Sequence, residues 1–185
     1  MIEEFQLKNG KIVVIKYLTI QDCELNNNYE SMHSWLNQVS HYMTRDYRPE
    51  DLEQDKKKYY KMLSKPEESV VIGAISNSKI IGHCKLYNRR RPKVRHLGKW
   101  AIAIHPSFQR QGLGTRMLEI MEQIAMNRGL KKLEASFIDG NKVAENLYLR
   151  KMNYTIEGCK RMAILTGGGK YKDVISIGKI LDDSR

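Results

Sequence analysis

The sequence is poor in the features that mark secreted and membrane-spanning proteins. It has three cysteines, Cys23, Cys84 and Cys159, which form neither a CxxC pair nor the even set of a disulfide framework. Scattered cysteines of odd number suit a reducing compartment, so we expect a cytoplasmic protein. No apolar run approaches the roughly 18 residues that a membrane span requires. Residues 1–10 are acidic where a secretory signal would be apolar, so we expect neither a signal nor a membrane partner.

Proline and internal repetition are also scarce. The chain has four prolines among 185 residues, with no repeat, low-complexity tract or Ser/Pro-rich linker. Hydrophobic residues make up 41% and charged residues 29% of the sequence, which excludes a disordered composition. A chain of this length can bury one sizeable core. We therefore expect a single domain over residues 1–185.

Positive charge is what the sequence has in excess. The formal net charge is +11, which suits a nucleic-acid binder but equally a basic enzyme that binds a polyphosphorylated cofactor. A basic tract of Arg89, Arg90, Arg91, Lys93 and Arg95 concentrates part of this charge between two expected strands. Such a tract is more often a solvated connector than a binding site. Nucleic acid therefore stays an unlikely partner.

The spacing of apolar residues predicts a mixed α/β order of elements. Short β-branched runs indicate strands, and apolar residues at a spacing of three or four indicate helices. The order implies a sheet that is antiparallel at both ends of the chain, with a βαβ unit in the middle. We expect a hairpin (5–7 and 11–17) with a type I′ turn at Asn9-Gly10, helices over 19–35 and 49–64, a hairpin (69–76 and 80–87) turning at Asn77-Ser78, a strand over 96–104, a helix over 112–128 ended by Gly129, a strand over 132–138, a helix over 141–151, and strands over 154–166 and 172–180.

A glycine-containing turn, residues 109–114, precedes the most regular helix of the sequence. That helix carries the apolar stripe Leu113, Met117, Met121 and Ala125. The N-terminus of a helix offers unpaired N–H groups and the positive end of its dipole, which together bind phosphate. Glycines at positions 112 and 114 let the backbone approach an anion closely, and arginines 110 and 116 add charge. Alone, this pattern is also that of an ordinary tight turn.

Two motifs resemble those of one enzyme family. The segment Q-R-Q-G-L-G (109–114), after the strand W-A-I-A-I-H-P, is similar to the Q/R-x-x-G-x-G/A signature of GNAT acetyltransferases. The segment N-K-V-A-E-N-L-Y-L-R-K-M-N-Y (141–154) resembles the family's N-x-x-A-x-x-L-Y-x-x-x-G-F. Asn153 replaces the family's glycine, and asparagine is the next residue best able to adopt a left-handed conformation.

The resemblance implies the fold, the co-substrate and the residues that bind it. The fold would be a central mixed, mostly antiparallel sheet with flanking helices, a cofactor-binding βαβ core over about 95–155 and acceptor-side helices over about 20–65. The co-substrate would be acetyl-CoA, with its pantetheine arm along one strand and its diphosphate on the glycine turn. The implied binding residues are Ile102, Ala103 and Ile104 through their backbone, then Gln109, Arg110, Gln111, Gly112, Leu113, Gly114 and Thr115, with Asn141 and Tyr148. Asn141 is also expected to cap its helix.

The resemblance also implies N-acetylation by direct attack of an amine in a ternary complex. Tyr148 would donate a proton to the leaving thiolate, although its apolar helix face suits core packing equally. The strand before the turn has no carboxylate, so His96 is our candidate base and Glu134 the fallback. The acceptor is left open between a small amine and a protein N-terminus or lysine, with a homodimer possible. The tyrosines of the early helices border the pocket or fill the core: Tyr42, Tyr47, Tyr59 and Tyr60.

Two other classes of function stay open at this point. The missing strand carboxylate suits a non-catalytic acyl-CoA-binding domain, and the basic tract suits, less well, a nucleic-acid binder. His83 next to Cys84 does not have the spacing of metal ligands, so we expect no metal.

Overall fold

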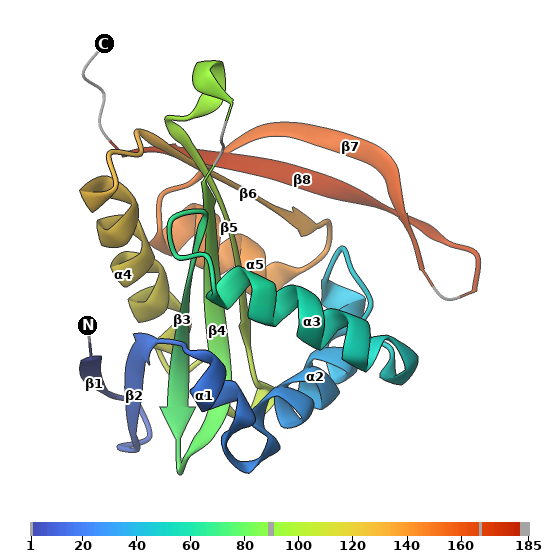
Figure 1. Cartoon of the computed structure of the whole chain (residues 1–185). Helices are drawn as coiled ribbons and strands as arrows, with labels where there is room; N and C mark the ends of the chain where they lie inside the picture. Colours follow the sequence, from blue (N-terminus) through green and yellow to red (C-terminus); the bar gives the residue numbers. More distant parts are fainter. Residues whose placement is uncertain (1, 89–90, 167, 182–185) are drawn as a thin grey trace.

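The computed structural model describes residues 2–88, 91–166 and 168–181. They form one eight-stranded sheet in the order β1-β2-β3-β4-β5-β6-β8-β7, with helices on both faces (Figure 1). The strands are β1 (Ile2–Gln6), β2 (Ile12–Tyr17), β3 (Ser69–Ser76), β4 (Lys79–Asn88), β5 (Leu97–Ile104), β6 (Lys132–Ile138), β7 (Thr155–Leu165) and β8 (Tyr171–Ile180). The helices are α1 (Ile20–Glu24), α2 (Asn28–Gln38), α3 (Leu52–Leu63), α4 (Leu113–Asn127) and α5 (Lys142–Glu145), and α5 continues into a π-helical turn, Asn146–Lys151.

The mixed α/β sheet expected from the sequence is confirmed. Among the described strands, β5 and β6 are the parallel pair, and every other neighbouring pair is antiparallel. Helix α4 connects β5 to β6, which makes the βαβ unit in the middle of the chain (Figure 1).

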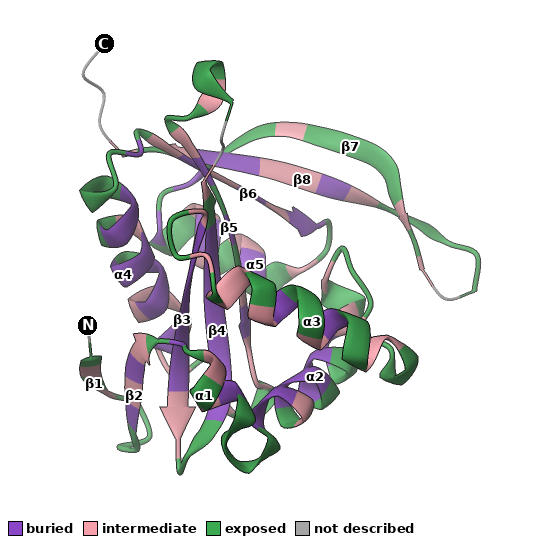
Figure 2. Ribbon diagram, in the orientation of Figure 1, coloured by how far each residue is buried: buried purple, intermediate pink, exposed green. Residues whose placement is uncertain are grey.

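Two apolar cores lie on opposite faces of the sheet. One contains the buried stripe of α4, and the other lies under α2 and α3, where Tyr29, Trp35 and Tyr59 are buried. Figure 2 shows buried residues along the central strands and on the side of α4 that meets them. Because side chains alternate along a strand, Cys84 and Leu86 of β4 join the α4 core while Lys85 between them faces α2 and α3.

The N-terminal half departs from expectation at a break in its first helix and at its first hairpin turn. A capping box begins α1, since the Asp22 N–H donates to the Thr19 hydroxyl at 3.2 Å and the Thr19 N–H donates to the Asp22 carboxylate at 3.0 Å. The helix expected over 19–35 is nevertheless broken, because Asn26 and Asn27 have φ values of 53° and 51° and separate α1 from α2.

Positive φ at both turn residues, which we expected at Asn9-Gly10, is found instead at Asn77-Ser78. A type I′ turn needs two residues with positive φ. At Asn9-Gly10 only Gly10 has it, with φ 84°, so the type I′ prediction is wrong there. At Asn77-Ser78 the values are 48° and 59°, and this two-residue turn joins β3 to β4.

The C-terminal half follows the sequence pattern more closely. Gly129 ends α4 with φ 72°, and Asn153 is left-handed at φ 57°, both as expected. The helix expected over 141–151 is instead a short α-helix followed by the π-helical turn. Turns of this kind are frequent at functional sites, and this one carries Tyr148.

Two features outside the sheet complete the description. Arg89 and Arg90 of the basic tract lie outside the described residues, while Arg91, Lys93 and Arg95 are exposed around a 3₁₀ turn, Pro92–Val94. The described helices are too short or too polar to traverse a lipid bilayer.

Candidate active site

The parallel strands β5 and β6 separate soon after they pair. Residues Leu97–Lys99 pair with Lys132–Glu134, and beyond these three positions the two strands diverge. Hydrogen bonds at the two ends of β5 show which of its backbone groups face β6. The His105 N–H donates to the Ile81 carbonyl on β4 at 2.8 Å, and the His96 carbonyl accepts from the Lys131 N–H on the β6 side at 2.9 Å. Even-numbered residues of β5 therefore direct their N–H and C=O toward β6.

Because of this alternation, only two of the three residues expected to hold the pantetheine direct backbone groups into the gap. Ile102 directs both backbone groups into the gap between β5 and β6, and Ile104 directs its N–H there. The Ile104 carbonyl accepts from the Gln109 side-chain amide at 2.9 Å, so Gln109 ties the turn to the strand. The backbone groups of Ala103 face β4, and its side chain is buried in the α2–α3 core. The expectation that Ala103 contacts the pantetheine through its backbone is therefore corrected, because these groups face β4.

The turn before α4 presents bare backbone at the start of a long helix. Gly112 occupies the N-cap position with φ 89°, a left-handed conformation in which a side chain is strained, and no side chain caps the helix. Among the described residues, the N–H groups of Leu113, Gly114 and Thr115 have no acceptor. This arrangement fits a diphosphate.

Gly114 has a different role from Gly112. A Cβ at position 114 would lie 3.1 Å from Leu147 Cδ2 and 3.3 Å from Ile104 Cδ1. The absence of a side chain therefore lets the first turn of α4 pack closely on β5 and on the π-helical turn. The sequence alone did not separate this packing role from a role in anion contact.

Of the two arginines near the turn, Arg116 forms ion pairs with carboxylates, and Arg110 forms none within the described residues. Arg116 donates to both Glu3 carboxylate oxygens at 2.6 and 2.7 Å and to Glu119 at 3.0 Å. These bonds raise its pKa, and they offset the charge that we expected it to offer a phosphate. Arg110 is exposed, with φ 58°, and no carboxylate of the described residues pairs with it.

Tyr148 is buried next to the gap between β5 and β6. Its ring lies edge-on to Trp100 of β5, with 4.9 Å between ring centroids, and 5.9 Å from Phe137 of β6. Burial raises the pKa of Tyr148 well above its usual range, so the phenol is protonated at neutral pH. Asn141 caps α5 by accepting from the Ala144 N–H at 3.1 Å, as expected.

The two candidate bases lie at different places on the sheet. His96 is exposed in the turn before β5, four residues from Trp100, which corresponds to about 13 Å of strand. The structure therefore does not bring His96 together with Tyr148. Glu134 is half-buried and belongs to the last residue pair that joins β5 to β6, opposite Lys99.

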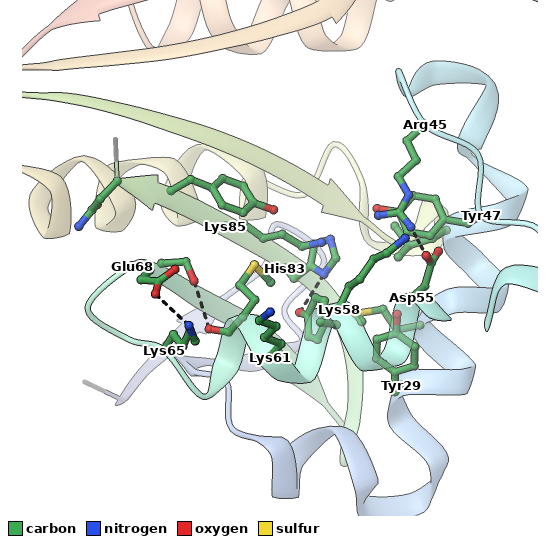
Figure 3. Close-up of a pocket in the computed structure, with 17 residues that line it drawn as sticks. Tyr29, Arg45, Tyr47, Asp55, Lys58, Lys61, Lys65, Glu68, His83 and Lys85 are labelled. Carbon is green, nitrogen blue, oxygen red and sulfur yellow. Dashed lines mark hydrogen bonds and ion pairs between the residues drawn. The ribbon is translucent and has the colours of Figure 1, made fainter. Parts of the chain in front are cut away.

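A cavity of about 380 Å³ lies between α2, α3 and the sheet (Figure 3). Of the expected tyrosines, Tyr47 and Tyr59 line it, Tyr60 packs partly buried against the core of α2 and α3, and Tyr42 is 52% exposed. The cavity is lined by Tyr29, Met32, Leu36, Arg45, Tyr47, Asp55, Lys58, Tyr59, Lys61, Met62, Lys65, Glu68, Ser69, His83, Lys85, Tyr87 and Asn88.

Two of the buried polar side chains in this cavity, Asp55 and His83, have polar neighbours within reach. Asp55 is paired with Arg45 and lies 3.5 Å from His33 Nε2. The Tyr59 hydroxyl lies 3.1 Å from His83 Nδ1. Burial, reinforced by the nearby charge of Lys85, holds the pKa of His83 well below its usual value, so the imidazole is neutral at pH 7.

The sequence analysis missed the polar floor of this cavity. The alternation of His83, Lys85 and Tyr87 along β4 was available as a signal. It did not distinguish a polar face open to water from one covered by helices, because α2 and α3 are distant in sequence from β4. His83, which we had weighed only as a metal ligand, is one of these floor residues; in the described part of the chain, metal-ligating side chains do not gather in groups of three.

Solved structures with a similar fold include acetyltransferases. A GNAT-family acetyltransferase from Streptococcus pneumoniae is 24% identical with a TM-score of 0.72, covering 92% of this chain and 99% of that one. A putative acetyltransferase from Salmonella typhimurium, solved with acetyl-CoA, is 18% identical with a TM-score of 0.75, covering 92% and 95%. The thialysine N-epsilon-acetyltransferase of Mus musculus is 34% identical over 47 residues, a match that covers 25% of this chain and only 28% of that enzyme.

The family itself is shown by a match of more than half the sequence. The model of the acetyltransferase (GNAT) family matches residues 32–154, which include the separating strands, the glycine turn and the π-helical turn. Acetyl-CoA is the co-substrate of this family. The chain therefore belongs to the GNAT family of acetyltransferases.

Proposed function

We propose that the protein transfers the acetyl group of acetyl-CoA to a primary amine while both are bound. The observation that carries this proposal is the position of the cavity relative to the gap between β5 and β6. Lys85 and His83, on the cavity floor, pair in register with Ala101 and Ala103, which flank Ile102 on β5. An amine in the cavity thus approaches a thioester held along Ile102 from the α2–α3 side.

Backbone groups hold the co-substrate in this account. The N–H and C=O of Ile102 and the N–H of Ile104 hydrogen-bond the pantetheine arm. The N–H groups at positions 113–115 and the charge of Arg110 bind the diphosphate. A backbone N–H of β5 also stabilises the oxyanion formed at the thioester carbonyl, a contact whose loss typically costs about 2.7–4 kcal/mol.

The amine must be deprotonated before it attacks. An amine with a pKa of about 10.4 is mostly protonated at neutral pH. We assign the acceptance of this proton to Glu134, directly or through water, because it lies where β5 and β6 separate. Side-chain alternation places it on the α2–α3 face, opposite to its buried neighbours Leu133 and Ala135.

Tyr148 completes the transfer on the other side of the thioester. The amine nitrogen bonds to the carbonyl carbon, the carbon–sulfur bond breaks, and the thiolate takes the proton of the Tyr148 hydroxyl. The nitrogen is positively charged once it has bonded, so it loses a further proton as the amide forms, and the phenolate regains one, both by exchange with solvent. Burial raises the pKa of Tyr148, so the hydroxyl carries its proton before the transfer begins.

The acceptor fits a cavity of the size found for small molecules. A small amine or the end of a peptide chain is compatible with about 380 Å³. We also propose a cytoplasmic location, since all three cysteines are free.

An acceptor screen tests this proposal. Thiol release from acetyl-CoA would be measured against a panel of small amines and peptides, with mass spectrometry of the products. Acetylated amine and stoichiometric free thiol are expected. Binding of acetyl-CoA with no transfer to any acceptor would instead establish a non-catalytic acyl-CoA-binding domain.

A further inference from the structure

Lys85 is a buried lysine on the floor of the cavity. Lys85 is 8% exposed, and its ammonium lies over the Tyr59 ring at 4.7 Å from the centroid. Lysine is almost never buried without a partner, because removing an ammonium from water is costly. Within the described ranges, no carboxylate forms an ion pair or hydrogen bond with Lys85.

The carboxylates around the cavity are already engaged. Its lining includes two, Asp55 and Glu68, which pair with Arg45 and with Lys65. The same lining includes five cationic side chains: Arg45, Lys58, Lys61, Lys65 and Lys85. In the part of the chain that the structure describes, Lys58, Lys61 and Lys85 have no anionic partner. Figure 3 shows lysines of α3 on one side of the cavity and Lys85 of β4 on its floor.

An excess of cations in an enclosed space selects against a polycation and for an anion. Charges interact more strongly when they are withdrawn from water, so a second ammonium would be repelled and an oxyanion attracted. Lys85 would donate charge-assisted hydrogen bonds to such an oxyanion. Its register partner Ala101 is adjacent to Ile102, so an anion bound there would be held within one small molecule's length of the transferred acetyl group.

We propose that the acceptor is an acidic amine, a molecule that carries an oxyanion besides its amino group, and that Lys85 binds this oxyanion. The inference rests on the proposed acetyl transfer and narrows its substrate class. A carboxylate and a phosphate ester share the required chemistry, and the test distinguishes them.

The test compares straight-chain amines of equal length that end in methyl, carboxylate, phosphate ester or a second ammonium. For the wild-type protein, kcat/KM for the better of the two oxyanion-ended amines should exceed that of the methyl-ended amine at least about tenfold, the factor expected for a charge-assisted hydrogen bond. The amine that ends in a second ammonium should be the poorest acceptor.

Lys85→Met removes the ammonium and keeps most of the length of the side chain. It should abolish the preference, mainly by raising KM for the oxyanion-ended amines, and it should change kcat/KM for the methyl-ended amine far less. Lys57→Met is the matched control, since Lys57 is an exposed lysine of the same α3 helix as Lys58 and Lys61 and lies outside the cavity lining. The preference of Lys57→Met for oxyanion-ended amines should equal that of the wild type.

Several outcomes would overturn the inference without touching acetyl transfer itself. One is a preference of the wild type for the methyl-ended amine or the diamine. Another is a preference for oxyanion-ended amines that survives in Lys85→Met. A third is an equal loss of kcat for all amines in that variant. If no amine is acetylated, the proposed function fails. Calorimetric binding of the oxyanion-ended amines to the wild type and to Lys85→Met then still decides whether Lys85 binds an oxyanion.

Discussion

The edge of the Tyr148 ring meets Trp100, with 4.9 Å between ring centroids and 82° between their planes. Trp100 belongs to β5 and Tyr148 to the π-helical turn, so this contact fixes the phenol beside the gap between β5 and β6. No hydrogen bond to another described side chain holds the hydroxyl, which is therefore available to a leaving thiolate.

Replacing Tyr148 with phenylalanine should remove the acid and keep the packing. We expect kcat to fall about 10²-fold, a typical loss for a general acid, with acetyl-CoA affinity nearly unchanged. Steady-state kinetics and calorimetry measure the two quantities. Tyr154→Phe is the control, because Tyr154 also packs on Trp100, at 5.4 Å, and should keep its kcat. Equal losses of kcat and affinity in Tyr148→Phe would show a packing role only.

Lys85 should make stability depend on pH in the alkaline range. Burial lowers the pKa of Lys85 to about 8, against about 10.4 in the unfolded chain. Between these values the unfolded state binds more protons, so the free energy of unfolding rises with pH through this window. Below pH 8 the buried charge costs roughly 3 kcal/mol in full.

The difference between wild type and Lys85→Met isolates this contribution, because other titrating groups are shared. Urea unfolding across this pH window should show the variant to be more stable at neutral pH and the advantage to shrink as the pH rises. A stability difference that is constant with pH would contradict the assigned burial of the ammonium.

Arg110 and Arg116 should differ in their effect on the co-substrate. Arg110→Gln removes an uncompensated charge beside the proposed diphosphate site, so acetyl-CoA affinity should fall about threefold or more at low salt and less at high salt. Arg116→Gln should leave affinity nearly unchanged, since Glu3 and Glu119 already offset its charge. Calorimetry at two salt concentrations measures both, and a larger loss for Arg116→Gln would reverse the assignment.

The base is tested by two isosteric changes. Glu134→Gln should lower kcat about 10²-fold or more for amines that are protonated at the assay pH. His96→Asn should leave kcat within about twofold of the wild type, because His96 lies about 13 Å of strand from Trp100. A loss of kcat confined to His96→Asn would restore histidine as the base.

Local patterns were enough to predict several elements around the glycine turn. The stripe of α4, the left-handed Gly129 and Asn153, and the Asn141 cap depend on residues close in sequence, and all are observed. The break between α1 and α2 was also signalled locally, by three consecutive asparagines at 26–28, but a continuous helix was expected there.

The acceptor half could not be predicted in the same way. Its cavity is made by α2, α3, β3 and β4, whose contacts are long-range, and the buried state of Lys85 depends on helices that cover one face of β4. The role of Arg116 was likewise fixed by Glu3, 113 residues away in sequence. Charge alone suggested a phosphate contact, and only the fold shows that the charge is already paired.

Calorimetry of acetyl-CoA binding to a Gly112 pair tests the central claim, that bare backbone at the start of α4 grips the diphosphate. Gly112→Asn and Gly112→Asp add side chains of nearly equal size at the same positive φ, so they share strain and differ in charge. Gly158→Asp, at an open position of β7, controls for the added charge. We predict wild-type affinity for Gly158→Asp, weakened binding for Gly112→Asn, and a further loss of at least about tenfold for Gly112→Asp. Equal affinities for the two Gly112 variants, with both still folded, would contradict the account.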